Sequence, residues 1–106
     1  MFAGRLPFRG LLCHIGRKSG KIYLTRVLVF KTLEGYIVPL EYGLRTQWLK
    51  NVQAAGYAYI RLHGKWLYLA NPHIISKAER PRLDLPILSA RRVFSASEYA
   101  LMLDQL

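Results

Sequence analysis

The hexapeptide Gly-Arg-Lys-Ser-Gly-Lys, residues 16–21, separates two apolar runs, residues 8–15 and 22–30. Glycine, serine and clustered cations interrupt a strand and favour a tight turn, so the segment predicts a hairpin tip between two strands. Glycines let backbone amides approach a ligand closely, and the Arg, Lys and Ser side chains offer donors to anionic oxygens. The turn is therefore either a solvated basic hairpin tip or a binding site for a phosphate or carboxylate. Its own residues leave both interpretations open.

Working outward from this turn, the pattern is mainly β. Strands are predicted over residues 8–15, 22–31, 36–41, 57–62 and 65–70. Pro39 lacks an N–H, which indicates an edge strand or a bulge at that point. His63-Gly64 is a two-residue turn that joins the last two strands into a hairpin. Residues 73–76 extend the sheet beyond the break at Asn71-Pro72.

A helix is predicted over residues 44–55, where apolar side chains recur at the helical period. Thr46 or the residue before it is the candidate N-cap, and Gly56 stands where a C-terminal glycine belongs. The Ser-Ala-Ser-Glu sequence at residues 95–98 has capping-box spacing, so a second, C-terminal helix is expected from about residue 96. Its inward-facing residues would be Tyr99, Met102 and Leu103.

The whole chain, residues 1–106, is expected to form a single domain. Strands that pair mainly with their sequence neighbours around one short helix predict a mainly β (α+β) fold, either a small antiparallel barrel or a strongly curled sheet. A parallel arrangement would need more crossover helices than the sequence supplies.

Charge and composition restrict the partners. Lys and Arg number 16 against 6 Asp and Glu, and the net charge of +10 predicts an anionic partner: nucleic acid, anionic lipid, or a phosphorylated or polycarboxylate small molecule. No apolar run approaches the roughly 20 residues of a bilayer span. Residues 1–7 are too short for a signal peptide, and a lone Cys13 allows no disulfide framework, so a cytoplasmic location is expected.

Several kinds of catalytic site lack the residues they need. His14, His63 and His73 have no metal-ligand spacing, and one cysteine cannot complete a structural zinc site. Cys13 lies in an apolar strand, where a thiol is usually inert, and the six carboxylates show no paired spacing for acid–base work. Any enzymatic chemistry would therefore be carried by a bound cofactor.

A second segment changes the interpretation of the turn. It reads Tyr42-Gly43-x-Arg45-Thr46-x-Trp48-x-x-Asn51 and follows the turn with Gly35-Tyr36-Ile37-Val38 between them. In this order and separation, the segments resemble the deazaflavin (coenzyme F-420)-dependent nitroreductase family of split β-barrel proteins. The resemblance covers about residues 8–76 and includes the helix end at residues 54–56.

The resemblance implies a six- or seven-stranded split β-barrel that binds coenzyme F-420 in a cleft. Such an oxidoreductase would pass a hydride from the reduced deazaflavin to a small, electron-poor, apolar or aromatic acceptor. By matched position, Lys18 and Ser19 would contact the cofactor phosphate, with Arg17 nearby. The residues that would line the cleft towards the ring are Tyr42, Gly43, Arg45, Thr46, Trp48 and Asn51.

Individual roles leave alternatives open. Tyr42 or Tyr23 is the candidate proton donor to the reduced product, although a tyrosine often serves packing alone. Trp48 fits the helix core as well as a ring contact, whereas Arg45 opposes the dipole at a helix start and so has less structural reason to be there. The nitroreductase branch has an Arg where this chain has Tyr23, and Arg26 is the nearest substitute.

The cofactor and the class of activity also have alternatives. Related split barrels bind FMN, which is the second candidate cofactor. The protein could instead be a non-catalytic module that binds such a cofactor, or, as a weaker prediction, nucleic acid through strands rich in tyrosine. The alternating aromatic residues 57–68 fit an exposed barrel face or a homodimer interface better than a nucleic-acid platform.

Overall fold

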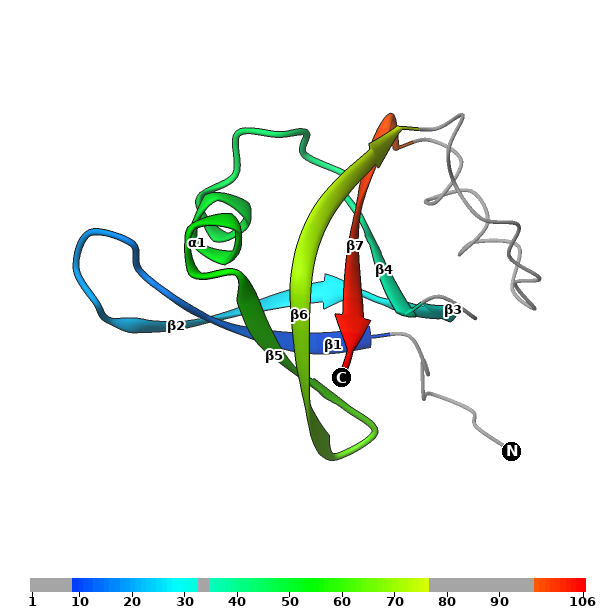
Figure 1. The fold of residues 1–106 in the computed structure, drawn as a ribbon, viewed down its shortest axis with the longest axis horizontal. Coiled ribbons are helices and arrows are strands. Elements are labelled where there is room, and N and C mark those ends of the chain that lie inside the picture. Colours follow the sequence, from blue (N-terminus) through cyan, green and yellow to red (C-terminus); the bar gives the residue numbers. More distant parts are fainter. Residues whose placement is uncertain (1–8, 33–34, 77–96) are drawn as a thin grey trace.

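Seven strands and one short helix make up the computed structural model, which describes residues 9–32, 35–76 and 97–106 (Figure 1). The strands are β1 (Arg9–Ile15), β2 (Ile22–Leu28), β3 (Phe30–Thr32), β4 (Gly35–Pro39), β5 (Tyr57–Leu62), β6 (Lys65–Ser76) and β7 (Tyr99–Gln105), and the helix is α1 (Gln47–Ala55). All strand pairings are antiparallel. The prediction of a mainly β, antiparallel fold with a helix after the first strands is confirmed.

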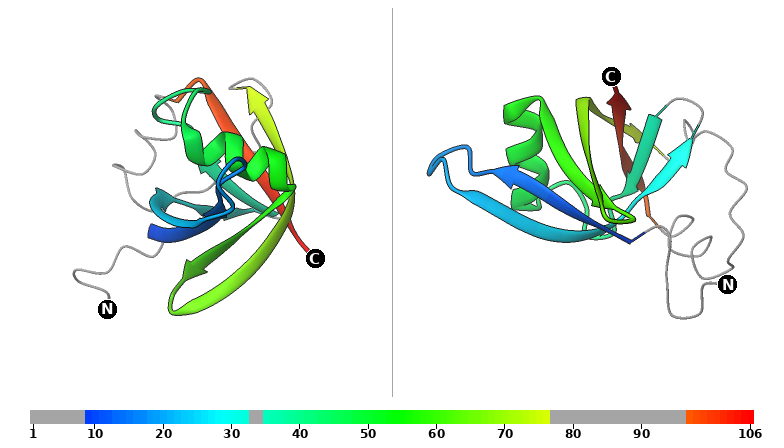
Figure 2. Two further views of the ribbon diagram at one scale, coloured as in Figure 1. Left: turned by 90° about the vertical axis from the view of Figure 1, so that its left-hand side faces the viewer. Right: turned by 90° about the horizontal axis from the view of Figure 1, so that it is seen from below.

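The strands form one sheet in the order β2-β1-β5-β6-β7-β4-β3. The two edge strands, β2 and β3, follow one another in the chain and are joined at Val29, which is fully buried. The chain itself therefore connects the two edges, and the sheet curls into a half-barrel (Figure 2). Most pairings join consecutive strands, as predicted, but β1 with β5 and β4 with β7 are distant in sequence.

The core fills the inside of the curled sheet, where α1 packs on β1, β5 and β6. Its central cluster consists of Leu12, Val29, Tyr36, Val38, Leu40, Leu49, Val52, Ala58, Ile60, Leu69, Leu101 and Leu103. A second, smaller cluster on the other side of β4 and β7 consists of Phe30, Ile37, Ala100 and Met102. Burial of these apolar side chains is the main source of stability.

The predicted C-terminal helix is wrong: the segment Tyr99–Gln105 is strand β7. It lies between β6 and β4 and is buried on both faces, with Leu101 and Leu103 in the central cluster and Ala100 and Met102 in the second. A continuous apolar run of this length cannot be separated from a buried helix by its period alone. The first residues of the supposed capping box, 95 and 96, lie outside the described residues, as do the irregular segments expected at 1–7 and 77–92.

Other boundaries differ in detail. The strand predicted over 22–31 is two strands, because the chain passes from one sheet edge to the other at Val29. The break expected at Asn71-Pro72 is a bulge within β6, with the register shifted between Ala70 and His73. Pro39 ends β4 opposite Ala100 of β7, and β3 has already stopped on its other side, so its missing N–H leaves no ladder bond unmade.

Helix α1 begins at Gln47, three residues later than predicted. Thr46 is its N-cap but makes no side-chain capping bond, whereas Gly56 ends the helix in a left-handed conformation (φ 83°) and donates its N–H to Val52 O at 2.8 Å. No helix within the described ranges is long and apolar enough to cross a bilayer.

Candidate functional site

The β1–β2 turn is fastened to the helix by Arg17. Its backbone N–H donates to Asn51 Oδ1 at 3.1 Å, and its guanidinium donates from Nη1 to the same oxygen at 2.8 Å and from Nη2 to Gln47 Oε1 at 2.9 Å. Because Asn51 is buried, the two bonds to its Oδ1 are shielded from water on the helix side, whereas the bond to Gln47 is exposed. Arg17 therefore positions the basic turn. Part of its hydrogen-bonding capacity is used by side chains of the helix.

A chain of hydrogen bonds continues from Asn51 into the sheet. Since Arg17 can only donate, Asn51 Oδ1 is the acceptor, and Asn51 Nδ2 faces His14 Nδ1 at 3.0 Å. His14 Nδ1 must then accept, so the ring carries its proton on Nε2 and donates to Thr25 Oγ1 at 3.0 Å. Burial lowers the pKa of His14 below its usual 6.5, which agrees with this neutral ring.

The turn uses most of its own donors internally. Gly16 N–H donates to Lys21 O at 2.8 Å, Gly20 N–H to Gly16 O at 2.9 Å, and Lys21 N–H to Ser19 Oγ at 3.2 Å. Ser19 Oγ also lies 3.3 Å from the hydroxyl of Tyr23. The donors without a partner among the described residues include the ammonium groups of Lys18 and Lys21 and the amides of Lys18 and Ser19.

These residues surround a first hollow, which we call the turn cleft. It has a volume of about 400 Å³. Its lining consists of His14, Gly16, Arg17, Lys18, Ser19, Tyr23, Gln47 and Asn51. The lining includes two cations and no carboxylate, which makes it suited to an anionic group. Four residues predicted for the cofactor site, from both motifs, are brought together here: Arg17, Lys18, Ser19 and Asn51.

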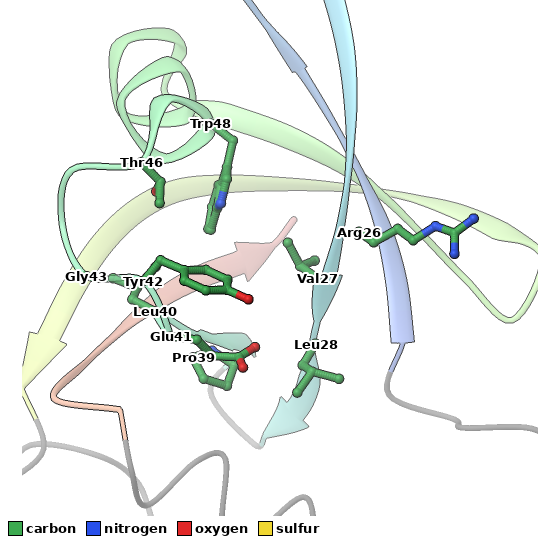
Figure 3. A pocket seen from close by; sticks show the side chains of 10 residues that line it. All are labelled: Arg26, Val27, Leu28, Pro39, Leu40, Glu41, Tyr42, Gly43, Thr46 and Trp48. Carbon is green, nitrogen blue, oxygen red and sulfur yellow. The ribbon is translucent and has the colours of Figure 1, made fainter.

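Four of the other predicted residues, Tyr42, Gly43, Thr46 and Trp48, line a second hollow, the loop pocket, between β2 and the loop that precedes α1 (Figure 3). It holds about 40 Å³ and is lined by Arg26, Val27, Leu28, Pro39, Leu40, Glu41, Tyr42, Gly43, Thr46 and Trp48. Tyr42 is 83% exposed and extends from the loop towards β2. Trp48 is partly buried against the central core and also lines the pocket, so its position is compatible with either interpretation of its role.

Thr46 gives the loop pocket an unused polar group. Its Oγ1 is buried and has no hydrogen-bond partner among the described residues. A buried hydroxyl without a partner is unusual in a protein and marks a place where a ligand atom or a water can bind. Arg45, by contrast, is exposed and lines neither the turn cleft nor the loop pocket.

The turn cleft and the loop pocket share no residue, but they lie along the same side of β2. Side chains alternate along a strand, so Tyr23, Thr25 and Val27 share one face. Tyr23 lines the turn cleft with Gln47, and Val27 lines the loop pocket with Trp48, which places both hollows beside α1. Four residues of strand separate them, a distance of about 13 Å.

A third and larger hollow, the arginine hollow, was not anticipated from the sequence. Its volume is about 870 Å³, and it is lined by Arg9, Gly10, Leu11, Arg26, Val27, Leu28, Glu41, Tyr42, Arg61, His63 and Gly64. Arg9 and Arg26 lie in the first hairpin, but only the pairing of β1 with β5 brings Arg61 to them. That pairing is too distant in sequence to be read from local pattern.

No group of three or more potential metal ligands occurs in the described part of the chain. The polar and aromatic side chains that line the hollows are mostly arginines, a lysine, hydroxyls and aromatic rings, together with His14, His63 and one carboxylate, Glu41. Such a donor set binds anions and flat apolar groups.

A curled antiparallel sheet of this topology with one helix defines a split β-barrel. The structure is similar to that of HutZ, described as the heme storage protein of Vibrio cholerae, with a TM-score of 0.60 and 9% sequence identity over 94% of this chain and 82% of that chain. At this identity, the similarity shows the fold alone. No protein-family model matches the sequence, and neither does any curated protein.

Proposed function

We propose that this protein is a deazaflavin-dependent oxidoreductase of the nitroreductase type, which binds coenzyme F-420. In this proposal the anionic tail lies at the turn cleft and the ring lies at the loop pocket, and a hydride passes to a small electron-poor acceptor. The proposal rests on where the two sequence segments lie, the basic turn at residues 16–21 and the segment at residues 42–51. Their residues surround two hollows on one side of β2, separated by about 13 Å of strand.

The turn cleft has the chemistry expected for a phosphate. Lys18 and the amides of Lys18 and Ser19 have no partner among the described residues, and no carboxylate lines the cleft. Charge-assisted hydrogen bonds from an ammonium and from backbone N–H groups are the stronger class of such bonds. Arg17, Asn51 and Gln47 hold the turn against α1, so that these donors are positioned before a ligand arrives.

The loop pocket supplies an apolar wall and one hydrogen-bonding group for a ring. Its 40 Å³ is too small for a flavin-sized ring by itself. It adjoins, however, the arginine hollow, with which it shares Arg26, Val27, Leu28, Glu41 and Tyr42. The ring would therefore lie across this shared boundary, with Tyr42 displaced or stacked on it and Thr46 Oγ1 bonded to a polar edge.

The bound deazaflavin would supply the hydride, and the residues of this chain would bind, orient and exclude water. Of the two candidate proton donors, Tyr42 lies at the ring end of the site, whereas the Tyr23 hydroxyl is near Ser19 at the phosphate end. Tyr42 is therefore the donor in this proposal. Arg45 has no part in it, because it lines neither hollow.

The test is a fluorescence titration of the purified protein with F-420, with FMN in parallel. Lys18→Ala is expected to weaken F-420 binding about tenfold, which is about 1.4 kcal/mol, because it removes one charge-assisted contact. Lys21→Ala is the matched control: it removes a cation of the same turn that does not line the cleft, and it should change affinity less than twofold. Thr46→Val, which keeps the shape of the side chain, should weaken binding of the ring.

Different outcomes would replace or overturn the proposal. Tighter binding of FMN than of F-420 would assign FMN as the cofactor. Because the similar structure is that of a heme storage protein, hemin is a third titrant, and preferential hemin binding would favour a non-catalytic binding module. Binding of none of the three at tens of micromolar, or equal losses in Lys18→Ala and Lys21→Ala, would show that the site is misplaced.

A further inference from the structure

We infer that the arginine hollow is a binding site for an apolar molecule that carries a carboxylate or a similar small anionic group. This ligand differs from the small apolar or aromatic acceptor expected from the sequence in that it carries an anionic group. Where the hollow meets the loop pocket, its occupant would be the acceptor for the hydride, and that role rests on the proposed function. The site itself is argued from the hollow alone.

Strand register places the cations around one apolar residue. Leu11 of β1 is paired with Arg26 of β2 on one side and with Arg61 of β5 on the other, so the three side chains form a row on one face of the sheet. Neighbouring strands are about 4.8 Å apart, which puts the two arginine backbones about 10 Å from each other. Arg9, two residues before Leu11, projects from the same face about 7 Å along β1.

The charges of these arginines are unmatched in the described part of the chain. The side chains of Arg9, Arg26 and Arg61 make no ion pair or hydrogen bond there. Figure 3 shows the Arg26 side chain extending away from Tyr42 and Trp48, so it is directed out of the loop pocket. Three free guanidiniums around one hollow, on a protein of net charge +10, attract an anion and can bind a carboxylate in a bidentate manner.

The floor and the size of the hollow argue for more than a bare anion. Leu11, Val27 and Leu28 supply apolar surface, and about 870 Å³ is within the range of small-molecule sites. The one carboxylate of the lining, Glu41, is on the loop that carries Tyr42. The anionic group of a ligand would therefore bind on the strand side, between Arg9 and Arg61, and its apolar body would extend over Leu28 towards Tyr42.

The test compares two fluorescent probes of similar shape, anilinonaphthalene sulfonate, which is anionic, and phenylnaphthylamine, which is neutral. The anionic probe is expected to bind at least tenfold more tightly. Arg9→Gln and Arg61→Gln should each weaken its binding at least threefold, and the double variant at least tenfold, while binding of the neutral probe stays within twofold. Lys65→Gln removes an equal charge from a residue that does not line the hollow and should have no such effect.

Equal affinity for the two probes would overturn the inference, because apolar contact alone would then explain binding. Equal losses in Arg61→Gln and Lys65→Gln would also overturn it, because net charge would then explain the effect. The result is separable from that of the cofactor titration. Arg9 and Arg61 line only the arginine hollow, so Arg61→Gln should leave F-420 affinity within twofold. Charge-dependent probe binding without F-420 binding would support this site and reject the proposed function.

Discussion

Asn51 Oδ1 accepts two hydrogen bonds from Arg17, one from its backbone nitrogen at 3.1 Å and one from Nη1 at 2.8 Å. The two residues are 34 positions apart, and their contact joins the tip of the first hairpin to the helix. Through its Nδ2, the same buried amide also meets His14 in the sheet. Asn51 therefore connects three elements, and it makes the basic turn a positioned surface.

The first prediction concerns the stability that this contact provides. Asn51→Leu keeps the size of the side chain but leaves a buried His14 nitrogen and the Arg17 donors without a partner. Leaving such groups unsatisfied costs about 1–3 kcal/mol of unfolding free energy. Urea unfolding measures the loss, and a double-mutant cycle with Arg17→Met should show a coupling of about 0.5 kcal/mol or more. Gln47→Ala, at the exposed end of the same network, should cost less than about 1 kcal/mol. Additive effects of Arg17→Met and Asn51→Leu would contradict this account.

The sequence indicated this region for a different reason. Asn51 was expected to line a ligand cleft, and it does line the turn cleft, but its three contacts are made within the protein. Local turns and hairpins were predictable, because glycine, proline and two-fold alternation act over a few residues. The pairings of β1 with β5 and of β4 with β7 were not, since they depend on tertiary packing. The arginine hollow and the strand character of Tyr99–Gln105 both follow from those pairings.

The second prediction is a pH dependence from His14. Burial lowers its pKa in the folded protein below 6.5, so the unfolded chain binds the proton more tightly. The stabilising contribution is complete above about pH 6.5 and is lost as the pH falls from there through the lowered pKa of the folded state. Protonation would also place a second donor against Asn51 Nδ2.

Urea unfolding midpoints at several pH values between about 7.5 and 5 would measure this effect against His14→Gln, which cannot titrate. The wild type should lose more stability on acidification than the variant. A parallel fall in both proteins would assign the loss to other groups. An NMR titration of the His14 ring with a midpoint at or above 6.5 would contradict the lowered pKa.

The third prediction separates two glycines with positive φ. Gly20, at φ 73°, has open space around the position of a Cβ, so Gly20→Ala meets only the conformational cost, about 1–2 kcal/mol. Gly35, at φ 143°, opens β4, and its Cβ would run into the backbone carbonyl oxygen of Leu103. Backbone cannot move aside as a side chain can, so Gly35→Ala should be clearly more destabilising. Comparable losses of unfolding free energy in the two variants would rule out the steric argument.

The fourth prediction is that the protein forms a homodimer through the outer face of β2, β1, β5 and β6. Two neighbouring rows on this face consist of Ile22 and Ile15, which are paired with each other, and of Leu24, Cys13, Tyr59 and Tyr68, beside which Tyr57 is paired with Ala70. Neither row contains a charged residue, although the chain carries a net charge of +10. Ile22 and Leu24 are 69% and 57% exposed, and the three tyrosines contact one another. A contiguous exposed apolar patch of this kind marks an interaction surface.

A second copy of the chain fits these rows better than nucleic acid does. Nucleic-acid platforms place cations among the aromatic rings, whereas here the arginines begin only in the next row, at Arg26 and Arg61. Light scattering coupled to gel filtration should therefore find a dimer, and Leu24→Glu should raise its dissociation constant about tenfold or more, because it buries an unpaired charge. Lys31→Glu, at an exposed position of the edge strand β3, is the control for the added negative charge and should leave the dimer intact. A monomeric wild-type protein that binds single-stranded oligonucleotide in a salt-dependent way would instead assign this face to nucleic acid.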